Sequence, residues 1–401
     1  MGEIRAVVFL GMNPWDYSEI NDSVRFLAAA CTKVDSLYIE PPRGLRGALN
    51  NPAYLLSNIR WRKTDRNGVT VYMPPLGFAP VFFGLRKYAD NYTAAKFDRI
   101  LEELYGRSWR EQTLVYISSW SYTQTHFIKR LKPKYLIFHI LDDSFAFPEI
   151  KNNPRVLAGN KSFYQYMMAN SSAVIAVSPE LAGKYSALYH RDVHIIKNGV
   201  NVEHFRRNEF TPVPEMAGIH QPVLMYTGSF NSWVDLKLLI KLADDRPGYS
   251  LVLIGHYYEG STDANLWQVL LSKANVYWLQ SKPYATLPAY MQHAAALLLP
   301  RTKDEHSLAS DPLKLYEYLS TGKPVISTAL PAVGDFREYV YVSDREDFAA
   351  SIDRAIKEQD PARVRRQVAM MEKHSWRARV NELAGILLAN CGTTFVTTQE
   401  S

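Results

Sequence analysis

This sequence of 401 residues lacks most of the features that assign a chain to a special class. Its two cysteines, Cys31 and Cys391, lie far apart and show neither a disulfide framework nor metal-ligand spacing. No apolar run approaches the roughly 20 residues that a membrane-spanning helix needs. The start, MGEIRAVVFLG, is too short and too acidic for a secretory signal. These absences exclude a stapled secreted domain and a transmembrane protein, and they predict a cytoplasmic location.

Positive charge is concentrated in one stretch, residues 41–88. The whole chain has a net charge of +6, yet this stretch alone has eight basic residues against the single acid Asp65. Basic residues interleaved with aromatic and leucine side chains suit an anionic membrane surface better than nucleic acid, for which no binding motif is present. The alternative is that the basic side chains form a solvated face and that the aromatic side chains belong to the core beneath it. The residues concerned are Arg43, Arg46, Arg60, Arg62, Lys63, Arg66, Arg86 and Lys87, with Tyr54, Leu55, Leu56, Trp61, Phe78, Phe82 and Phe83.

Short apolar runs alternate with helical stretches along the whole chain, which is typical of parallel sheets covered by helices. A polar, proline-bearing segment at residues 205–221 indicates a linker. We therefore predict an α/β protein of two doubly wound, Rossmann-like domains facing a cleft, residues 1–205 and 206–375, with a helix in 376–401 that packs back on the first. The expected strands are residues 6–10, 36–39, 70–73, 114–117, 135–139, 173–177, 193–196, 223–227, 250–255, 276–279, 295–299 and 324–327; the expected helices include 22–31, 92–104 and 181–188.

One segment, ASDPLKLYEYLSTGKPV at residues 309–325, indicates a binding site. Asp311 suits a helix N-cap and Gly322 suits the far end, so Lys314 lies in the first turn with Glu317 one turn on. A cation at a helix N-terminus makes a favourable seat for a diphosphate. A carboxylate one turn further in can accept two vicinal hydroxyls, as a ribose offers. From spacing alone, a surface ion pair between Lys314 and Glu317 is the alternative.

Several blocks in the right order resemble glycosyltransferases of the GT-B fold. No G-x-G-x-x-G follows the first strand of either half, which disfavours a dinucleotide dehydrogenase. YTGSFNSWVDLKLL at 226–239, KPYATLPAY at 282–290 and DPLKLYEYLSTGKPVI at 311–326 resemble the second domain of that family. SSAVIAVSPEL at 171–181 and IIKNGVNVEHF at 195–205 resemble its strand-to-linker passage. MNPWD at 12–16 and HILDDSFAF at 139–147 resemble enzymes of teichuronic-acid-type polysaccharide synthesis.

The resemblance implies a donor site for a nucleoside-diphosphate-sugar. Glu317 matches the second acid of the family's E-x7-E motif, and Lys314 resembles the pyrophosphate lysine of the glucuronosyltransferases of xanthan synthesis. The first acid is replaced by Ala309, so a retaining mechanism does not follow; Asp304, Glu305 or Asp311 are candidates for part of its role. The family's usual arginine after Gly228 is also missing. The other implied donor residues are Gly11, Gly228, Ser229, Lys237, Lys282 and Tyr284.

The implied activity is transfer of a hexosyl or glycuronosyl group to a lipid-linked or glycan acceptor, on the inner face of the cell membrane. Asp142 and Asp143 follow a predicted strand and are the candidate bases, with Asp142 preferred; either can instead cap a turn. His139 and Asp16 are candidate sugar or acceptor contacts. We expect no cofactor and no metal. A sugar-nucleotide epimerase of the same fold and a non-catalytic scaffold are the rivals. The sugar, nucleobase, acceptor, stereochemistry and oligomeric state are left open.

Overall fold

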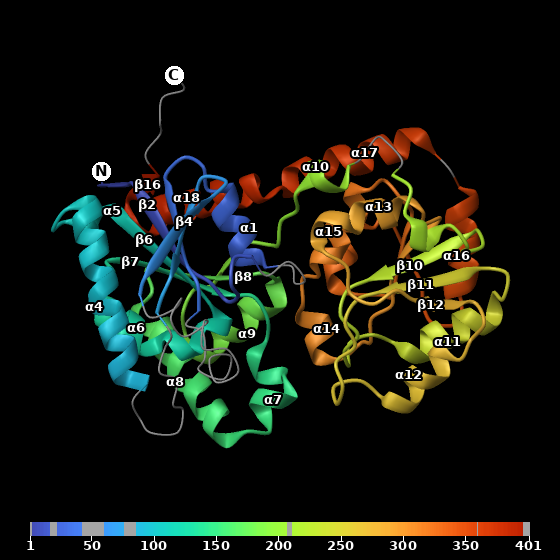
Figure 1. The fold of residues 1–401 in the computed structure, drawn as a ribbon, viewed down its shortest axis with the longest axis horizontal. Helices are drawn as coiled ribbons and strands as arrows, with labels where there is room; N and C mark the ends of the chain where they lie inside the picture. Colours follow the sequence, from blue (N-terminus) through green and yellow to red (C-terminus); the bar gives the residue numbers. More distant parts are fainter. Residues whose placement is uncertain are drawn as a thin grey trace. The chain divides into compact units, whose positions relative to one another are not determined.

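A computed structural model describes residues 2–16, 22–41, 60–75, 86–206, 211–358 and 360–395. The described chain divides into two compact units (Figure 1). The first unit contains the described residues up to Lys197 and again from Arg379 onward, and the second contains Asn198–Ala378. The first crossing between the units therefore lies at Lys197–Asn198, ahead of the linker that the sequence indicated.

The first unit is built on an eight-stranded sheet in the order β4-β5-β3-β2-β6-β7-β8-β9. All neighbouring strands are parallel except the edge pair β4 and β5. Helices lie on both sides of this sheet (Figure 1). The elements are β2 Ala6–Leu10, α1 Ser23–Ala30, β3 Asp35–Ile39, β4 Arg62–Arg66, β5 Val69–Met73, α4 Arg86–Tyr105, α5 Trp109–Gln112, β6 Thr113–Ser118, α6 Thr125–Leu131, β7 Tyr135–Ile140, α7 Pro148–Lys151, α8 Pro154–Asn170, β8 Ala173–Ala176, α9 Pro179–Tyr189 and β9 His194–Ile195.

The second unit is built on a six-stranded, wholly parallel sheet in the order β12-β11-β10-β13-β14-β15. Its strands are apolar on both faces, because alternate residues of β10 enter two separate cores: Val223 and Met225 face one, and Leu224 and Tyr226 face the other. The elements are α10 Val202–Phe205, β10 Val223–Thr227, α11 Leu236–Asp245, β11 Ser250–Ile254, α12 Ala264–Leu271, β12 Val276–Trp278, α13 Leu287–Gln292, β13 Ala296–Leu299, α14 Glu305–Ala309, α15 Leu313–Ser320, β14 Val325–Ser327, β15 Val340–Val342, α16 Phe348–Lys357 and α17 Pro361–Met371.

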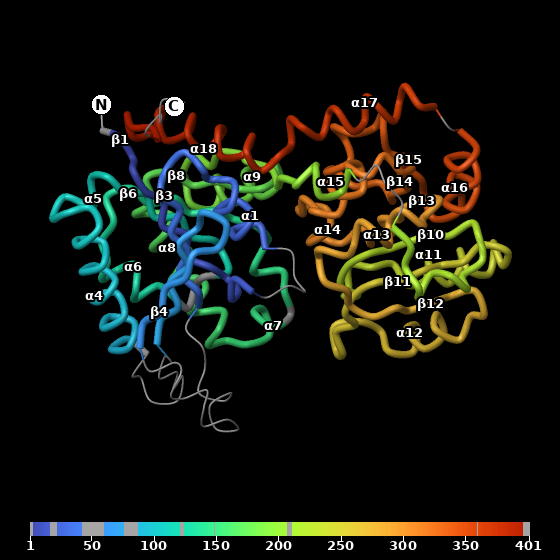
Figure 2. Tube along the Cα trace, turned by 45° about the horizontal axis from the view of Figure 1, so that its top comes forward, coloured from blue at the N-terminus to red at the C-terminus, as the bar shows by residue number. Residues whose placement is uncertain are grey.

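The C-terminal segment returns to the first unit. Helix α18, Trp376–Cys391, leads into strand β16, Thr393–Phe395, which pairs in parallel with β1, Gly2–Ile4. Figure 2 shows β1 beside the end of α18. The predicted helix is present, whereas the strand pair was not predicted, because its two short strands lie at opposite ends of the chain.

The two segments that cross between the units are hydrogen-bonded to each other within the second unit. The N–H of Val200 donates to the carbonyl of His374 at 3.0 Å, and the N–H of Trp376 donates to the carbonyl of Val200 at 3.3 Å. A Cβ on Gly199 would lie 2.7 Å from the Trp376 ring. Glycine at 199 thus lets the Trp376 ring lie directly on the crossing segment.

Candidate functional site

The carboxyl ends of β10 and β11 form a tight backbone surface at two glycines. Gly228 and Gly255 have positive φ angles of 129° and 148°, which favour glycine. A Cβ on Gly255 would lie 2.0 Å from the carbonyl oxygen of Gly228, and a Cβ on Gly228 would lie 1.8 Å from Cε of Lys314. Both positions therefore need glycine, and the second lets the Lys314 side chain lie against the turn that follows β10.

Lys314 is held among groups that disfavour its charge. Its Nζ lies 5.7 Å from the centroid of the Tyr226 ring, which attracts a cation weakly. Burial, followed by the nearby positive charge of Arg301, lowers the pKa of Lys314 to about 8, while Glu317 opposes the shift. Because these surroundings disfavour the charged amine, an anion that binds beside Lys314 would stabilise it more than it would stabilise a fully solvated lysine.

Arg301 is the functional candidate that the sequence analysis missed. It follows β13 and is buried, with its guanidinium 5.7 Å from the Trp233 ring centroid. The hydroxyl of Thr328 accepts from the N–H of Arg301 at 3.2 Å and donates to its carbonyl at 2.8 Å. Its position at the carboxyl end of a parallel strand, where α/β folds bind ligands, is the signal that points to it.

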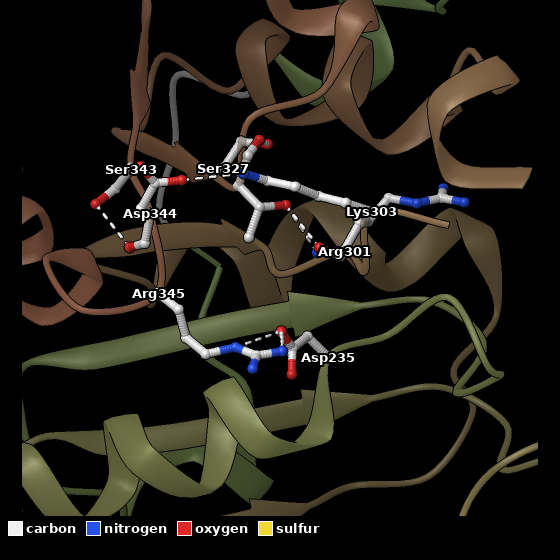
Figure 3. A network of polar contacts seen from close by, with 8 residues as sticks. Asp235, Arg301, Lys303, Ser327, Ser343, Asp344 and Arg345 are labelled. Atoms are coloured by element: carbon white, nitrogen blue, oxygen red, sulfur yellow. Dashed lines mark hydrogen bonds and ion pairs between the residues drawn. The ribbon is translucent and has the colours of Figure 1, made fainter. Parts of the chain in front are cut away.

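A network of polar contacts ties together the loops around Arg301 (Figure 3). Arg345, from the loop after β15, donates to the carboxylate of Asp235 through Nε at 3.0 Å. The same buried carboxylate caps α11 by accepting from the N–H of Leu238 at 3.0 Å. Lys303 pairs with Asp344 at 3.0 Å. The loops after β13 and β15 and the start of α11 are thereby linked.

The helix that carries Lys314 begins in a different way from the one predicted. Helix α15 has Pro312 at its N-cap position, without a side-chain cap. The carboxylate of Asp311 instead accepts from the N–H of Asn198 at 2.6 Å and from the hydroxyl of Tyr316 at 2.7 Å. The N-cap prediction for Asp311 is therefore wrong, because a partner 113 residues away in sequence takes this carboxylate. Glu317 is in the predicted helix but is only 3% exposed, so the surface ion pair is excluded.

One of the alternative acids, Asp304, has a structural role at the start of the short helix α14. Residues 301–311 contain the short helix α14, and Asp304 caps it by accepting from the N–H of Ser307 at 2.7 Å. The same carboxylate accepts from the hydroxyl of Thr302 at 2.6 Å. Asp304 thus stabilises the short helix that ends at Ala309.

The remaining predicted donor residues in the second unit differ in their contacts and in their exposure. Lys282 forms an ion pair with Glu215 at 2.8 Å, and Tyr284 stacks on His204 with ring centroids 4.7 Å apart. The carbonyl of Ser229 accepts from the hydroxyl of Tyr226 at 3.0 Å. Lys237 is exposed in the first turn of α11. Nucleobase and phosphate contacts at these positions stay predictions.

In the first unit, Gly11 follows β2 and lies against Tyr38. A Cβ on Gly11 would lie 2.3 Å from the Tyr38 hydroxyl oxygen, so only glycine fits there. The loop beyond it is held by Glu40, whose carboxylate accepts from the N–H of Trp15 at 3.0 Å. Asp16 at the end of this loop is 70% exposed in its side chain and pairs with Arg66 at 2.9 Å.

The two aspartates after β7 have different surroundings. Asp142 is half-buried, and its Oδ2 accepts from the indole N–H of Trp120 at 3.0 Å. The side chain of Asp143 is 1% exposed and accepts from Lys184 at 2.5 Å and from the hydroxyl of Tyr185 at 2.9 Å. These contacts make Asp143 part of the protein scaffold and leave Asp142 as the better candidate for direct chemistry.

Replacement of Asp143 by Asn is expected to lower the free energy of unfolding. The variant keeps the side-chain volume but loses the charge that Lys184 and Tyr185 bind, and hydrogen bonds to a charged group contribute about 1.5–3 kcal/mol. Urea denaturation followed by circular dichroism measures the difference. Asp142→Asn is the matched control, and equal stability of the two variants would contradict the scaffold role.

His139 is buried on β7 and neutral. Burial lowers its pKa to about 3, and its Nδ1 shares a hydrogen bond with the hydroxyl of Tyr116. This is the geometry of a packed core histidine. Its predicted contact with a sugar or acceptor stays a prediction.

The basic stretch is described only in part. Arg43, Arg46 and the residues Tyr54, Leu55, Leu56, Phe78, Phe82 and Phe83 lie outside the described residues. Within them, Arg60, Arg62 and Lys63 are exposed at the edge strand β4 and the residues before it. Trp61 instead stacks on Phe97, with centroids 5.9 Å apart, and so joins the core.

Two kinds of site are absent from the described ranges. In these ranges no group of three or more histidine, cysteine, aspartate or glutamate side chains is placed to hold a metal ion. No helix there has the length and apolar content needed to cross a membrane. Metal independence stays a prediction.

Comparisons with known sequences match part of the chain. Residues 217–370 match the family model described as glycosyl transferases group 1. Over 171 residues the chain is 29% identical to TuaH of Bacillus subtilis (strain 168), named as a teichuronic acid biosynthesis glycosyltransferase. This alignment covers 41% of the chain and 42% of the relative, less than half of each. Similarity to the xanthan glucuronosyltransferases stays a prediction.

Solved structures match nearly the whole chain. The trehalose-6-phosphate synthase OtsA has a TM-score of 0.67 and 12% identity, covering 95% of this chain and 98% of its own. Anabaena Alr3699/HepE, solved in complex with UDP and glucose, has a TM-score of 0.65 and 15% identity, covering 96% and 99%. Identities this low show the fold alone, and they confirm the predicted GT-B fold class.

Proposed function

We propose that this chain is a glycosyltransferase that moves a sugar from a nucleoside-diphosphate-sugar to a lipid-linked or glycan acceptor during synthesis of a cell-surface polysaccharide. The observation that carries the proposal is the pair of cations Lys314 and Arg301 at the carboxyl ends of the second sheet, with the Gly228 turn against Lys314. Two partly or fully buried cations that raise each other's electrostatic energy favour binding of a dianionic diphosphate.

The second unit would bind the donor. When the bond between the anomeric carbon and the diphosphate oxygen breaks, the electron pair leaves with the diphosphate, and Lys314 and Arg301 would stabilise the charge that develops there. Glu317, one turn along α15, would accept hydrogen bonds from the ribose hydroxyls. The matching family model and the UDP and glucose bound by Alr3699/HepE support a nucleotide-sugar donor.

The first unit would supply the base. The acceptor hydroxyl oxygen forms a bond to the anomeric carbon, and its proton passes to the carboxylate of Asp142. Attack from the face opposite the leaving diphosphate inverts the anomeric centre, which agrees with Ala309 in place of the acid that holds the sugar in retaining relatives. The name of TuaH supports teichuronic-acid-type polysaccharide synthesis, with a hexosyl or glycuronosyl donor.

A binding and turnover screen tests the proposal. Calorimetry with UDP, GDP, UDP-glucose and UDP-glucuronic acid is expected to give saturable binding for at least one compound. Release of the free diphosphate is then measured with and without soluble glycan and lipid-linked sugar primers. Release that depends on a primer supports transfer, whereas conversion of the donor without a primer identifies an epimerase. Binding without turnover of any donor identifies a scaffold, and no binding contradicts the donor site.

Donor affinity is expected to fall as the pH rises above about 8. The pKa of Lys314 is lowered to about 8, so above this pH its amine is mostly uncharged in the free protein. Donor binding must then be accompanied by uptake of one proton at Lys314. One linked proton predicts a loss of roughly tenfold in affinity for each pH unit above 8. Calorimetry from pH 7 to about pH 10 measures this dependence. Lys314→Arg is the control, because arginine keeps its charge throughout this range and should give a nearly flat profile.

We also propose that the first unit binds an anionic membrane surface through the exposed residues near β4. Reversal of Arg60, Arg62 and Lys63 to glutamate is expected to lower binding to phosphatidylglycerol-containing vesicles by at least about 100-fold, since each basic residue near such a surface contributes about 1 kcal/mol and the introduced acids are repelled. Flotation with these vesicles, and with phosphatidylcholine alone, measures the effect. The control reverses Arg365, Arg366 and Lys373, exposed residues of the second unit, and equal loss in both triple variants would show that net charge alone matters.

A further inference from the structure

Two consecutive side chains after β6 hold two consecutive residues after β7. The hydroxyl of Ser119, which is buried, accepts from the N–H of Leu141 at 3.2 Å. The indole N–H of Trp120 donates to Oδ2 of Asp142 at 3.0 Å. Strands β6 and β7 are parallel neighbours with Ser118 opposite His139, so both contacts lie at the carboxyl edge of the sheet. The position of Asp142 is therefore set from the neighbouring strand.

The Trp120 ring is itself fixed. Its centroid lies 4.8 Å from that of Phe147 with an interplanar angle of 78°, an edge-to-face pair. The carbonyl of Asp142 accepts from the N–H of Ser144 at 3.0 Å, which holds the backbone at Asp142. Backbone and carboxylate of Asp142 are thus each held by a separate hydrogen bond.

We propose that Trp120 is the positioning residue for Asp142 in glycosyl transfer, an inference that rests on the proposed function of Asp142 as base. An indole N–H is a donor only, so it favours the ionised carboxylate, which is the form that accepts a proton. The same hydrogen bond to Oδ2 also restricts rotation of the Asp142 side chain. Asp143, the neighbouring aspartate, receives its hydrogen bonds from Lys184 and Tyr185 instead.

The test removes the N–H while keeping an aromatic ring. Trp120→Phe, and a second variant with β-(3-benzothienyl)alanine at position 120 that replaces the N–H by sulfur, are compared with wild type. The protein is labelled with 13Cγ aspartate, and the Asp142 resonance is assigned by its absence in Asp142→Asn. In both variants its titration midpoint is expected to move to higher pH, and transfer at neutral pH is expected to fall roughly tenfold. None of these variants replaces Asp143, Lys184 or His139, so the titratable residues nearest to Asp142 in the sequence are the same in every protein compared.

Phe147→Leu is the comparison variant, because it loosens the ring packing without removing the N–H, so its titration midpoint should move less than in the two Trp120 variants. A midpoint and a transfer rate unchanged in both Trp120 variants would overturn the inference, provided that Asp142→Asn is inactive. An active Asp142→Asn would overturn the base assignment instead, whatever the titration shows. Thermal unfolding of each variant separates loss of function from loss of the fold.

Discussion

Lys314→Ala is expected to weaken binding of the donor's nucleoside diphosphate by about 100-fold. Truncating one partner of a buried ion pair with a ligand costs about 2–5 kcal/mol, and 2.7 kcal/mol corresponds to this factor. The loss should appear in the affinity measured by calorimetry with UDP and with the best donor of the screen. It should persist at high salt, because a buried pair is screened little by ions.

The same variant is not expected to lose stability. Since burial and Arg301 lower the pKa of Lys314 in the folded protein, folding penalises the charged amine at neutral pH, and removal of the amine relieves that penalty. Weaker binding with an unchanged or higher melting temperature is the pattern of a binding residue. Lys241→Ala is the control, because Lys241 pairs on the surface of α11 with Asp245 at 2.6 Å. Full binding by Lys314→Ala would exclude this helix as the diphosphate site.

Asp142→Asn is expected to slow transfer by about 10²–10⁴-fold while donor binding stays unchanged. General base catalysis contributes a factor of this size, and asparagine cannot take a proton from the acceptor hydroxyl. The change keeps the volume of the side chain and an oxygen that accepts from the Trp120 indole, so the fold should be preserved. Single-turnover transfer measured with saturating donor separates the chemical step from binding.

The controls for this second prediction are Asp143→Asn and the acceptor-free reaction. Asp143→Asn should unfold at a lower temperature than wild type, because Lys184 and Tyr185 bind that carboxylate. At low temperature, where the variant is still folded, it should keep its transfer activity. If Asp143→Asn instead abolished transfer in the folded protein while Asp142→Asn stayed active, the two roles would have to be exchanged.

Much of the fold was predictable because the strands and helices follow from the local pattern of apolar residues. Strand β10, Val223–Thr227, and strand β2, Ala6–Leu10, have the predicted bounds, since a strand buried on both faces is a continuous apolar run. Strand β4, Arg62–Arg66, was not predicted, because an exposed edge strand has no apolar pattern. Strand β15, Val340–Val342, was also not predicted.

The candidate site was predictable only in part. The helix with Lys314 and Glu317 followed from its own spacing, and the Gly228 turn from its place after a strand. Arg301 was not found, because its place after the predicted strand of residues 295–299 does not by itself show that it lies near Lys314. Asp311 was misread as a helix cap, because its true partner, Asn198, is reached only through the tertiary fold.

The sequence by itself therefore determined the two doubly wound domains, the helix of residues 313–320 and the resemblance to GT-B glycosyltransferases. The tertiary structure alone decided which carboxylate after β7 is bound by a lysine and which by an indole, and which cation lies close enough to Lys314 to lower its pKa. The physical reason is range: periodicity and capping act over a few residues, whereas burial and charge depend on groups that are distant in the chain and adjacent in space.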